Sequence, residues 1–348
     1  MNASVTDALK QYTADSLQVR WYKRLLHFKK PARTSRGDLC ERATYIIELR
    51  CGESMGVGEC CTMPGLLPMP TAEQMDYYCA QLQREGRIPA DENMPSPLRF
   101  ALETAMLRLM HHGQACWDNS FTRGEQGIRI HHLVWMDSID NMLASMAEGI
   151  RRGFQCLKMK VGALPFDKEL EMLHEARKSF PFAEIRLDAN GAFAPNEALN
   201  MLDALAECGI AYIEQPIAPG QWDDMRHICR YSSIPIALDE ELIAHANRTE
   251  SRQQLLSSIN PQAIVIKPSL HGGFTAAEHW AQLAEDMQID WWINSALESS
   301  IGLTALAEWC SYRAPFTMHG LGTGQLFTDD SPERISLQGE SLYYLPNQ

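Results

Sequence analysis

The run CLKMKV at residues 156–161 holds two lysines inside an otherwise apolar stretch. In an extended strand successive side chains point to opposite faces, so Lys158 and Lys160 share one face. The other face carries the apolar side chains of Leu157, Met159 and Val161. The run therefore predicts a strand that packs against helices on one side and presents two ammonium groups on the other.

Seven further apolar runs have the same length and character. They are HHLVWM (131–136), EIRLDA (184–189), AYIEQPI (211–217), PIALDE (235–240), AIVIKPS (263–269), WWINSAL (291–297) and FTMHGL (316–321). Segments with a helical pattern, such as 166–180 and 196–209, lie between them. Eight strand–helix units of ~25 residues predict an α/β fold, a (β/α)8-type, TIM-like barrel over residues 128–324. An open doubly wound sheet is the structural alternative, but units of near-equal length favour closure.

Residues 1–127 have a different pattern. Three strand-like stretches (LQVRWYKRLLHF, CERATYIIELRC and SMGVGECC) precede the turn-rich MPGLLPMP and a helical segment at 96–112. This order predicts an N-terminal α+β capping domain. The last residues, 325–348, are too few to fold alone, so we expect them to complete that domain.

The composition excludes several classes of function. The 348 residues carry a formal net charge of −13, which would repel phosphates, so nucleic-acid binding is not expected. No stretch of about 18 apolar residues exists, so no membrane span is expected. The first residues lack the apolar segment of a secretory signal. The ten cysteines form no CxxC pair, which is typical of reduced thiols, and we expect a cytoplasmic protein.

Three carboxylates end successive predicted strands: Asp188, Glu214 and Asp239. In a barrel these strand ends meet at one face, where active sites lie. Three unpaired carboxylates would raise one another's pKa, and a hard cation removes that repulsion. A set of oxygen ligands without Cys or His favours Mg²⁺, with Mn²⁺ as a substitute, over zinc.

The lysines supply proton chemistry. Lys158 and Lys160 are like charges on one face, so each lowers the pKa of the other and one can act as a base. Lys267, in the run AIVIKPS, points into the barrel from the opposite side. We expect a small carboxylate substrate between the two lysine sites, with its carboxylate on the metal. The metal would stabilise the negative charge that forms when a neighbouring proton is removed.

Three acidic or amide side chains near these strand ends leave alternatives open. Asn190 either contacts substrate or caps the loop after its strand. Glu241 has the parity of another inward side chain, although it is expected to lie already in a loop. Either Glu240 or Glu241 could add to the metal site.

Two further motifs are weaker indicators. GLGTG (320–324) predicts a short glycine-rich turn, whose N–H groups could also bind a substrate carboxylate. The pair His131-His132 has no catalytic partner visible in the sequence and is interpreted as structural.

The inward residues and their neighbours resemble a known family. The motifs are LKMKVG (157–162), RLDANGAF (186–193), YIEQP (212–216), ALDE (237–240), IKPS (266–269) and SALESSIGLTALA (295–307). Together they resemble the enolase superfamily, in its muconate lactonising subgroup, and within it the o-succinylbenzoate synthase family is most similar. The resemblance covers nearly the whole predicted barrel. The N-terminal TSRGDLCERATYIIELRCG and GVGECCTMPGL also resemble that family's capping module, where a loop near Arg36 closes over the site.

The resemblance implies a role for each inward residue. The three Mg²⁺ ligands of the family match Asp188, Glu214 and Asp239. Lys160 matches the base, which later delivers the proton to the departing hydroxyl, and Lys158 matches the neighbour that supports the substrate carboxylate. Lys267 matches a lysine whose ammonium lies over the ring of the intermediate. Candidates for further substrate contacts are Asn190, Ser295 and Arg36.

The activity that the resemblance implies is the syn-dehydration of 2-succinyl-6-hydroxy-2,4-cyclohexadiene-1-carboxylate to o-succinylbenzoate, in menaquinone biosynthesis.

N-succinylamino acid racemases carry much the same motifs, so racemisation, and with it epimerisation or cycloisomerisation, remains an alternative. Dipeptide epimerases show Asp-x-Asp after the eighth strand, where this chain has HGLGTG, and WWINSALES lacks the histidine base of mandelate racemase. A non-catalytic binding barrel would not need all three ligands, and all three are present.

Overall fold

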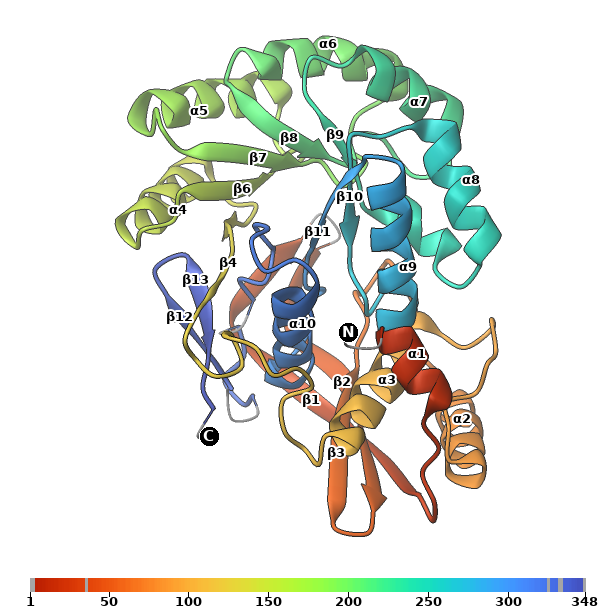
Figure 1. Cartoon of the computed structure of the whole chain (residues 1–348). Coiled ribbons are helices and arrows are strands. Elements are labelled where there is room, and N and C mark those ends of the chain that lie inside the picture. The colour runs from red at the N-terminus through yellow and green to blue at the C-terminus, as the bar shows by residue number, and fades with distance from the viewer. Residues whose placement is uncertain (1–3, 35–36, 324–325, 331–333, 347–348) are drawn as a thin grey trace.

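The computed structural model describes residues 4–34, 37–323, 326–330 and 334–346. Three antiparallel strands near the N-terminus form one sheet, which we call the capping sheet: β1 (Gln18–Thr34), β2 (Gly37–Cys51) and β3 (Ser54–Cys60). Helix α3 (Ser96–Met110) packs directly on β3, because a glycine there allows close approach. A Cβ on Gly58 would lie 1.9 Å from the carbonyl oxygen of Ala101. Helix α2 (Ala72–Glu85) lies in the same part of the molecule (Figure 1).

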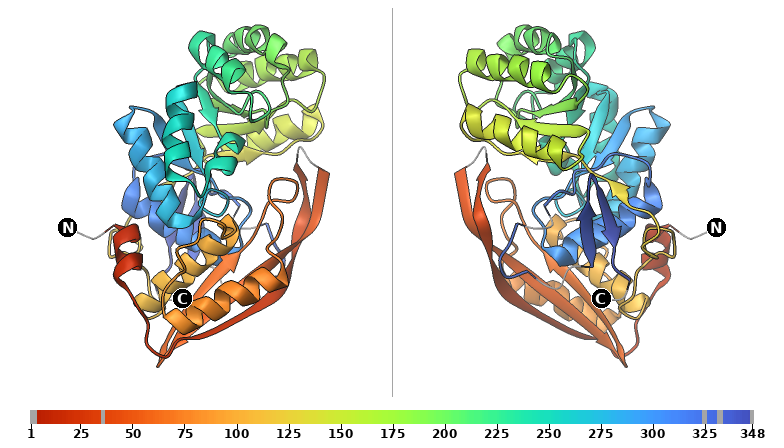
Figure 2. Two further views of the ribbon diagram at one scale, coloured as in Figure 1. Left: turned by 90° about the vertical axis from the view of Figure 1, so that its right-hand side faces the viewer. Right: turned by 90° about the vertical axis from the view of Figure 1, so that its left-hand side faces the viewer.

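A curled parallel sheet with helices outside it forms the larger part of the protein (Figures 1 and 2). Its strands, in chain order, are β5 (His132–Val134), β6 (Cys156–Lys160), β7 (Glu184–Asp188), β8 (Ile210–Glu214), β9 (Ile236–Leu238), β10 (Ala263–Ile266) and β11 (Asp290–Ile293). Its helices are α4 (Ile139–Arg151), α5 (Phe166–Ser179), α6 (Pro195–Ala206), α7 (Trp222–Tyr231), α8 (Thr249–Ile259), α9 (Gly273–Asp286) and α10 (Ser300–Arg313). The predicted fold class, a TIM-like barrel with an N-terminal α+β part, is confirmed.

The eighth predicted strand, 316–321, is reduced to two bridged residues. Parallel bridges join Ile130 to His319 and Asn294 to Gly320. These bridges connect the two edges of the seven-stranded sheet, so residues 319–320 close the barrel.

Strand parity predicts the inner and outer faces correctly. Alternate residues of the strands form an apolar cluster inside the barrel, below the polar side chains: Ala237, Ala263, Val265 and Trp292. Trp291, one residue before Trp292, points outward and packs near Trp309 of α10, with ring centroids 6.2 Å apart. The polar residues of the same strands therefore also project into the barrel.

The C-terminal hairpin pairs with the start of the barrel. Strands β12 (Ile335–Gln338) and β13 (Ser341–Tyr344) form a sheet with β4 (Ile128–Arg129), in the order β12-β13-β4. Upstream of the hairpin, Phe327 bridges to Phe28 of the capping sheet. The division into a capping domain and a barrel at residue 127 stays a prediction.

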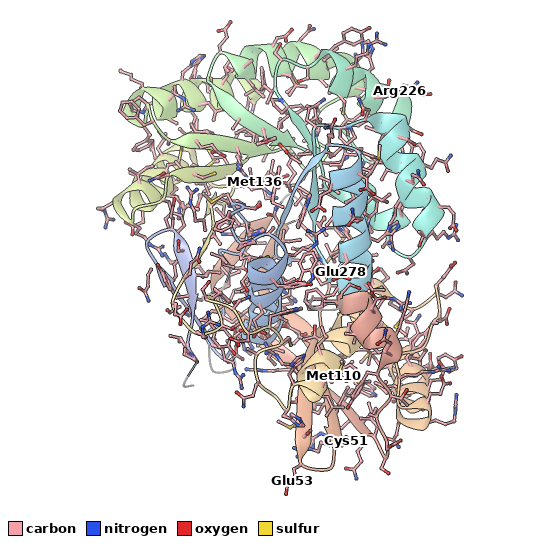
Figure 3. The ribbon with its side chains drawn as sticks, viewed as in Figure 1. Cys51, Glu53, Met110, Met136, Arg226 and Glu278 are labelled. Carbon is pink, nitrogen blue, oxygen red and sulfur yellow. The ribbon has the colours of Figure 1, made fainter. Side chains whose placement is uncertain are left out.

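The N-terminal helix α1 (Val5–Gln11) docks on the barrel helix α9. Glu278 of α9 accepts hydrogen bonds from the backbone N–H groups of Val5, at 2.9 Å, and Thr6, at 3.0 Å. Figure 3 shows Glu278 where α9 meets α1. Because a carboxylate at a helix N-terminus is favourable, this contact fixes α1 on the barrel.

All ten cysteines lie in the described ranges and are free thiols. Within those ranges, no helix has both the length and the apolar character that a membrane crossing requires.

Candidate active site

Three buried carboxylates meet at the carboxyl ends of β7, β8 and β9. Asp188 and Glu214 end adjacent strands and are direct register partners, and Asp239 follows the next strand. One oxygen from each lies within 4.8 Å of the others. Their exposed fractions are 0%, 2% and 1%, so water cannot stabilise their charge. We call these three residues the carboxylate triad.

The two lysines of β6 contact the triad from one side. Lys158 Nζ lies 2.8 Å from Asp188 Oδ2 and 2.5 Å from Glu214 Oε2. Lys160 Nζ lies 2.6 Å from Asp188 Oδ2 and donates to Asn190 Oδ1 at 2.8 Å. The predicted shared face of the two lysines is therefore what brings both to the triad.

Lys267 approaches from the opposite side of the barrel, at the end of β10. Its Nζ forms an ion pair with Asp239 Oδ2. Its backbone N–H donates to His271 Nδ1 at 3.0 Å, which fixes the start of the following loop. The triad thus lies between two lysine sites, as the order of the strands requires.

The charges of this cluster shift its pKa values in opposite directions. Burial opposes ionisation of Asp188, but Lys158 and Lys160 outweigh it and lower its pKa. Burial raises the pKa of Glu214 well above the usual value, and Asp188 adds to the rise. For Lys158, burial is outweighed by Asp188 and Glu214, so its pKa is raised. Lys158 is therefore held in its charged form by the carboxylates, and the assignment of Lys160 as the base stays a prediction.

The triad fits a hard divalent cation. All its donor atoms are carboxylate oxygens, which Mg²⁺ prefers, and their spacing allows them to share one ion. Among the described residues, none donates a hydrogen bond to the buried Glu214 Oε1 or Asp239 Oδ1. Buried polar atoms usually have a partner, so these two oxygens point to a ligand.

Asn190 and Glu240 lie together at the pocket, whereas Glu241 lies elsewhere. Asn190 lies in the left-handed region, with φ 46°, and donates from Nδ2 to Glu240 Oε1 at 2.9 Å. Glu240 lines the pocket described below. Glu241 instead accepts from the backbone N–H of Gly220 and from Trp222 Nε1, both at 2.9 Å. Alternation fails here because a 3₁₀ helix, η1 (Glu240–His245), begins directly after Asp239.

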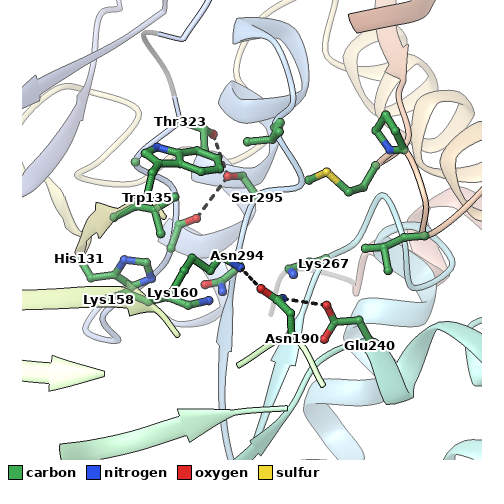
Figure 4. Close-up of a pocket in the computed structure, with 17 residues that line it drawn as sticks. His131, Trp135, Lys158, Lys160, Asn190, Glu240, Lys267, Asn294, Ser295 and Thr323 are labelled. Atoms are coloured by element: carbon green, nitrogen blue, oxygen red, sulfur yellow. Dashed lines mark hydrogen bonds between the residues drawn. The ribbon is translucent and has the colours of Figure 1, made fainter. Parts of the chain in front are cut away.

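A pocket that is partly open to solvent lies over the lysines (Figure 4). The polar residues lining it are His131, Lys158, Lys160, Asn190, Glu240, Lys267, Asn294, Ser295 and Thr323. The apolar residues lining it are Met63, Pro64, Leu66, Leu133, Trp135 and Leu297. The three from 63–66 follow β3, so the capping part supplies one wall.

Sequence reasoning missed several of these residues. His131, interpreted as structural, lies in the pocket with 3% of its surface exposed, and burial lowers its pKa well below the usual value. Asn294 has the same strand parity as the inward Trp292, so parity could have found it. Trp135 has the same parity as His131 and Leu133 in the run 131–136, and all three line the pocket, so parity could have found it too. Met63 carries no such signal, because its place depends on how loops pack across the barrel mouth.

The remaining candidates divide between the pocket and the undescribed residues. Ser295 lines the pocket, and its Oγ lies 2.7 Å from Thr323 Oγ1. Its backbone N–H donates to the carbonyl of Gly320 at 2.9 Å, so the GLGTG turn is tied to the loop after β11. Arg36 and Gly324 lie outside the described residues.

Comparisons with known proteins agree with this geometry. Residues 141–335 match the family described as enolase C-terminal domain-like. An o-succinylbenzoate synthase from Desulfotalea psychrophila is 38% identical over 91% of this chain and 96% of the relative.

Solved structures show the same fold over nearly the whole chain. A crystal structure of MenC from Desulfotalea psychrophila has a TM-score of 0.85, with 34% identity, over 94% of this chain and 100% of that chain. A dipeptide epimerase from Cytophaga hutchinsonii, solved with Mg and the dipeptide D-Ala-L-Val, has a TM-score of 0.81. Its 22% identity, over 94% of this chain and 93% of that chain, supports the fold alone. The chain belongs to the enolase superfamily and, within it, to the family of the o-succinylbenzoate synthases.

Proposed function

We propose that this protein is a Mg²⁺-dependent o-succinylbenzoate synthase, a carbon–oxygen lyase. It would convert 2-succinyl-6-hydroxy-2,4-cyclohexadiene-1-carboxylate to o-succinylbenzoate, as a cytoplasmic step of menaquinone biosynthesis. The observation that carries the proposal is a buried carboxylate triad between lysines on opposite sides, in a chain 38% identical to such a synthase over 91% of its length.

Asp188, Glu214 and Asp239 would hold the metal, with Mn²⁺ as a substitute for Mg²⁺. The bound ion would supply a Lewis acid that stabilises negative charge developing on the substrate carboxylate. Burial of all three ligands strengthens that electrostatic effect, because little water is present to screen it.

Lys160 would move the proton. Its Nζ would take the proton from the carbon beside the carboxylate and later deliver it to the departing hydroxyl, so that one C–H and one C–O bond break and water leaves. A syn-dehydration needs both transfers on one face, which a single lysine can perform. Asp188 of the triad lies 2.6 Å from Nζ, and Asn190, itself fixed by Glu240, adds a second contact at 2.8 Å from outside the triad.

Lys158 and Lys267 would stabilise charge without moving protons. Lys158, beside Asp188 and Glu214, would support the substrate carboxylate and tune Lys160. Lys267, on the other wall, would place its ammonium over the ring of the intermediate as a cation–π partner. Aromatisation of the ring then favours loss of water.

Racemisation of an N-succinylamino acid is the second candidate, because lysines on both sides of a substrate suit proton removal on one face and return on the other. The observation that favours it is the position of Lys160 and Lys267 on opposite walls of one pocket. Its substrates are also small carboxylates that carry a succinyl group, so the residues lining the pocket do not separate the two.

A steady-state assay with both substrate classes tests the proposal. Purified enzyme with Mg²⁺ should dehydrate the cyclohexadiene carboxylate faster than it exchanges or inverts the α-proton of N-succinylamino acids in D₂O. Lys160→Ala should abolish both reactions, whereas Lys168→Ala, an exposed lysine of α5, should leave them unchanged. Faster racemisation than dehydration would assign the enzyme to the second candidate, and turnover by Lys160→Ala would exclude the proposed base.

A further inference from the structure

The loop after β11, residues 294–299, supplies three lining residues of the pocket: Asn294, Ser295 and Leu297. Figure 4 shows Ser295 with Trp135 and Thr323 at the side of the pocket away from Asn190 and Glu240. Asn294 lies beside Lys160, the proposed base, whereas Ser295 lies at the side of the pocket away from Asn190.

Leu297 has a backbone conformation that its side chain disfavours. Its φ is 64°, in the left-handed region, although it is neither Gly, Asn nor Asp. A non-glycine residue keeps such a conformation only where the surroundings impose it. Its side chain is 3% exposed and packs with Leu26 and Phe28 of β1. The capping sheet thus contacts the strained residue directly.

Two charged residues of the capping sheet hold the chain on both sides of Leu297. Before it, Arg42 of β2 donates from Nη1 to the carbonyl of Ala296 at 3.3 Å. After it, Glu59 of β3 accepts from the backbone N–H of Ser299 at 2.9 Å and from its Oγ at 2.6 Å. Arg42 and Glu59 lie 3.7 Å apart, and their side chains are 2% and 0% exposed.

The carboxylate of Glu59 can accept from all its neighbours because it has no hydrogen to donate. Besides Ser299, it accepts from Thr44 Oγ1 at 3.2 Å and from the N–H of Gly302, at the start of α10, at 3.1 Å. An amide in its place would direct its own N–H₂ group at some of these donors. Glu59→Gln therefore changes little in size but removes part of the anchor.

We propose that Arg42 and Glu59 are positioning residues, through which the capping sheet fixes Ser295 and Leu297 and so sets the affinity for the substrate's tail. The inference rests on the proposed function for the identity of the substrate. The triad and the lysines are held by other contacts, so loss of the anchor should weaken binding more than it slows the chemical steps.

The protein contains a matched control for this anchor. Arg108 of α3 and Glu308 of α10 form another buried ion pair between the N-terminal part and the barrel, at 2.6 Å. Glu308 also accepts from the backbone N–H of Cys116 at 2.9 Å. Neither Arg108 nor Glu308 lines the pocket. Glu308→Gln should therefore lower stability without altering the loop after β11.

The experiment compares Glu59→Gln and Glu308→Gln in the full-length, Mg²⁺-loaded protein. Glu59→Gln should raise KM for the cyclohexadiene carboxylate about tenfold or more, with kcat changed by less than about threefold, because small displacements of positioning groups weaken binding strongly. Backbone amides of residues 296–302 should exchange with D₂O about tenfold faster. Glu308→Gln should leave both KM and this exchange within about twofold of wild type.

Each outcome decides the proposal. Equal KM changes in both variants, or a fall confined to kcat, would overturn the positioning role. If Glu59→Gln does not fold, Ser299→Ala takes its place, because it removes only the hydroxyl bonded to Glu59. Ser299→Ala should raise KM by a smaller factor, and an unchanged KM would overturn the positioning role. Amide exchange requires no turnover. If wild type does not dehydrate the substrate, the proposed function fails, while equal exchange in both variants would separately refute the anchor.

Discussion

Closure of the barrel depends on a neutral histidine, His319. Its ring is 0% exposed, its Nδ1 accepts from the backbone N–H of Ile293 at 3.2 Å, and its Nε2 donates to the carbonyl of Ala314 at 3.0 Å. The backbone N–H of Ile293 thus donates to an imidazole nitrogen and not to a backbone carbonyl of a neighbouring strand. A proton on Nδ1 would break this bond, and burial lowers the pKa of His319 from 6.5 to about 4.

The lowered pKa makes stability depend on pH with a definite sign. Between the two pKa values the unfolded chain binds one more proton at this residue, so the free energy of unfolding falls as pH falls below 6.5. The contribution is complete above that value and is lost as pH approaches about 4. Integrating between about pH 7.5 and about pH 5 gives a loss on the order of 2 kcal/mol from His319 alone.

The variant His319→Asn isolates this contribution. Asparagine places Oδ1 near the position of Nδ1, so it can still accept from Ile293, but it cannot gain a proton. It should be less stable than wild type at neutral pH, because it leaves space and loses the bond to Ala314. The difference in unfolding free energy between wild type and variant should then shrink by about 2 kcal/mol between about pH 7.5 and about pH 5.

Urea unfolding at several pH values, followed by circular dichroism, measures this difference. The exposed His227, replaced in the same way, serves as the control for loss of a histidine elsewhere in the chain. A difference between wild type and His319→Asn that stays constant to within about 0.5 kcal/mol would refute the reasoning, because it would mean that the folded and unfolded chains take up the proton equally.

Three further predictions concern the pocket. Glu214→Gln should abolish turnover chiefly by weakening Mg²⁺ binding, seen as a higher Mg²⁺ requirement by calorimetry; near-normal rates at ordinary Mg²⁺ would contradict the ligand assignment. Lys267→Arg keeps the positive charge and should retain part of the dehydration but no racemisation, measured by polarimetry; full racemase activity would exclude the electrostatic role. Gly320→Ala should reduce kcat/KM at least about tenfold, because its Cβ would lie 2.0 Å from Asn294 Oδ1. In the control Gly322→Ala the nearest atom to the new Cβ is 3.4 Å away, so activity should be near wild type. Equal effects of the two substitutions would show that space at Gly320 is not limiting.

The sequence was informative wherever one regular element decides a side chain's direction. Strand parity alone predicted that Lys158, Lys160, Asp188, Glu214 and Lys267 face one interior, since a strand leaves only two faces and the barrel gives each a fixed meaning. Asp239 comes one residue after β9 and also lies with the other two carboxylates. Its side chain points inward because it continues the alternation of the strand by one residue. What these residues do there is a proposal, but their meeting follows from periodicity.

Strand alternation no longer predicts side-chain direction after Asp239, because the backbone there changes from a strand to a 3₁₀ helix. Glu240 begins a 3₁₀ helix with three residues per turn, so Glu240 and not Glu241 lines the pocket. The eighth strand was overestimated for a related reason: an apolar run such as FTMHGL does not reveal how many of its residues form pairs. Met63 and Leu66 required knowledge of the packing between two parts of the chain, which no local pattern contains.

The same division explains why the proton chemistry is easier to infer than the specificity. Dehydration and racemisation both begin when a lysine removes a proton beside a carboxylate, and the residues for that step lie on regular strands. The substrates of both reactions carry a succinyl group and differ in the part that holds the reacting carbon, a ring or an amino acid. Ser295 and Leu297, which line the pocket on a loop held by the capping sheet, lie off the regular strands, so no strand pattern predicts which of these parts the pocket fits. On our proposal, a buried carboxylate at Glu59 would influence substrate binding through this loop without approaching the reacting atoms, while the triad and the lysines stay unchanged.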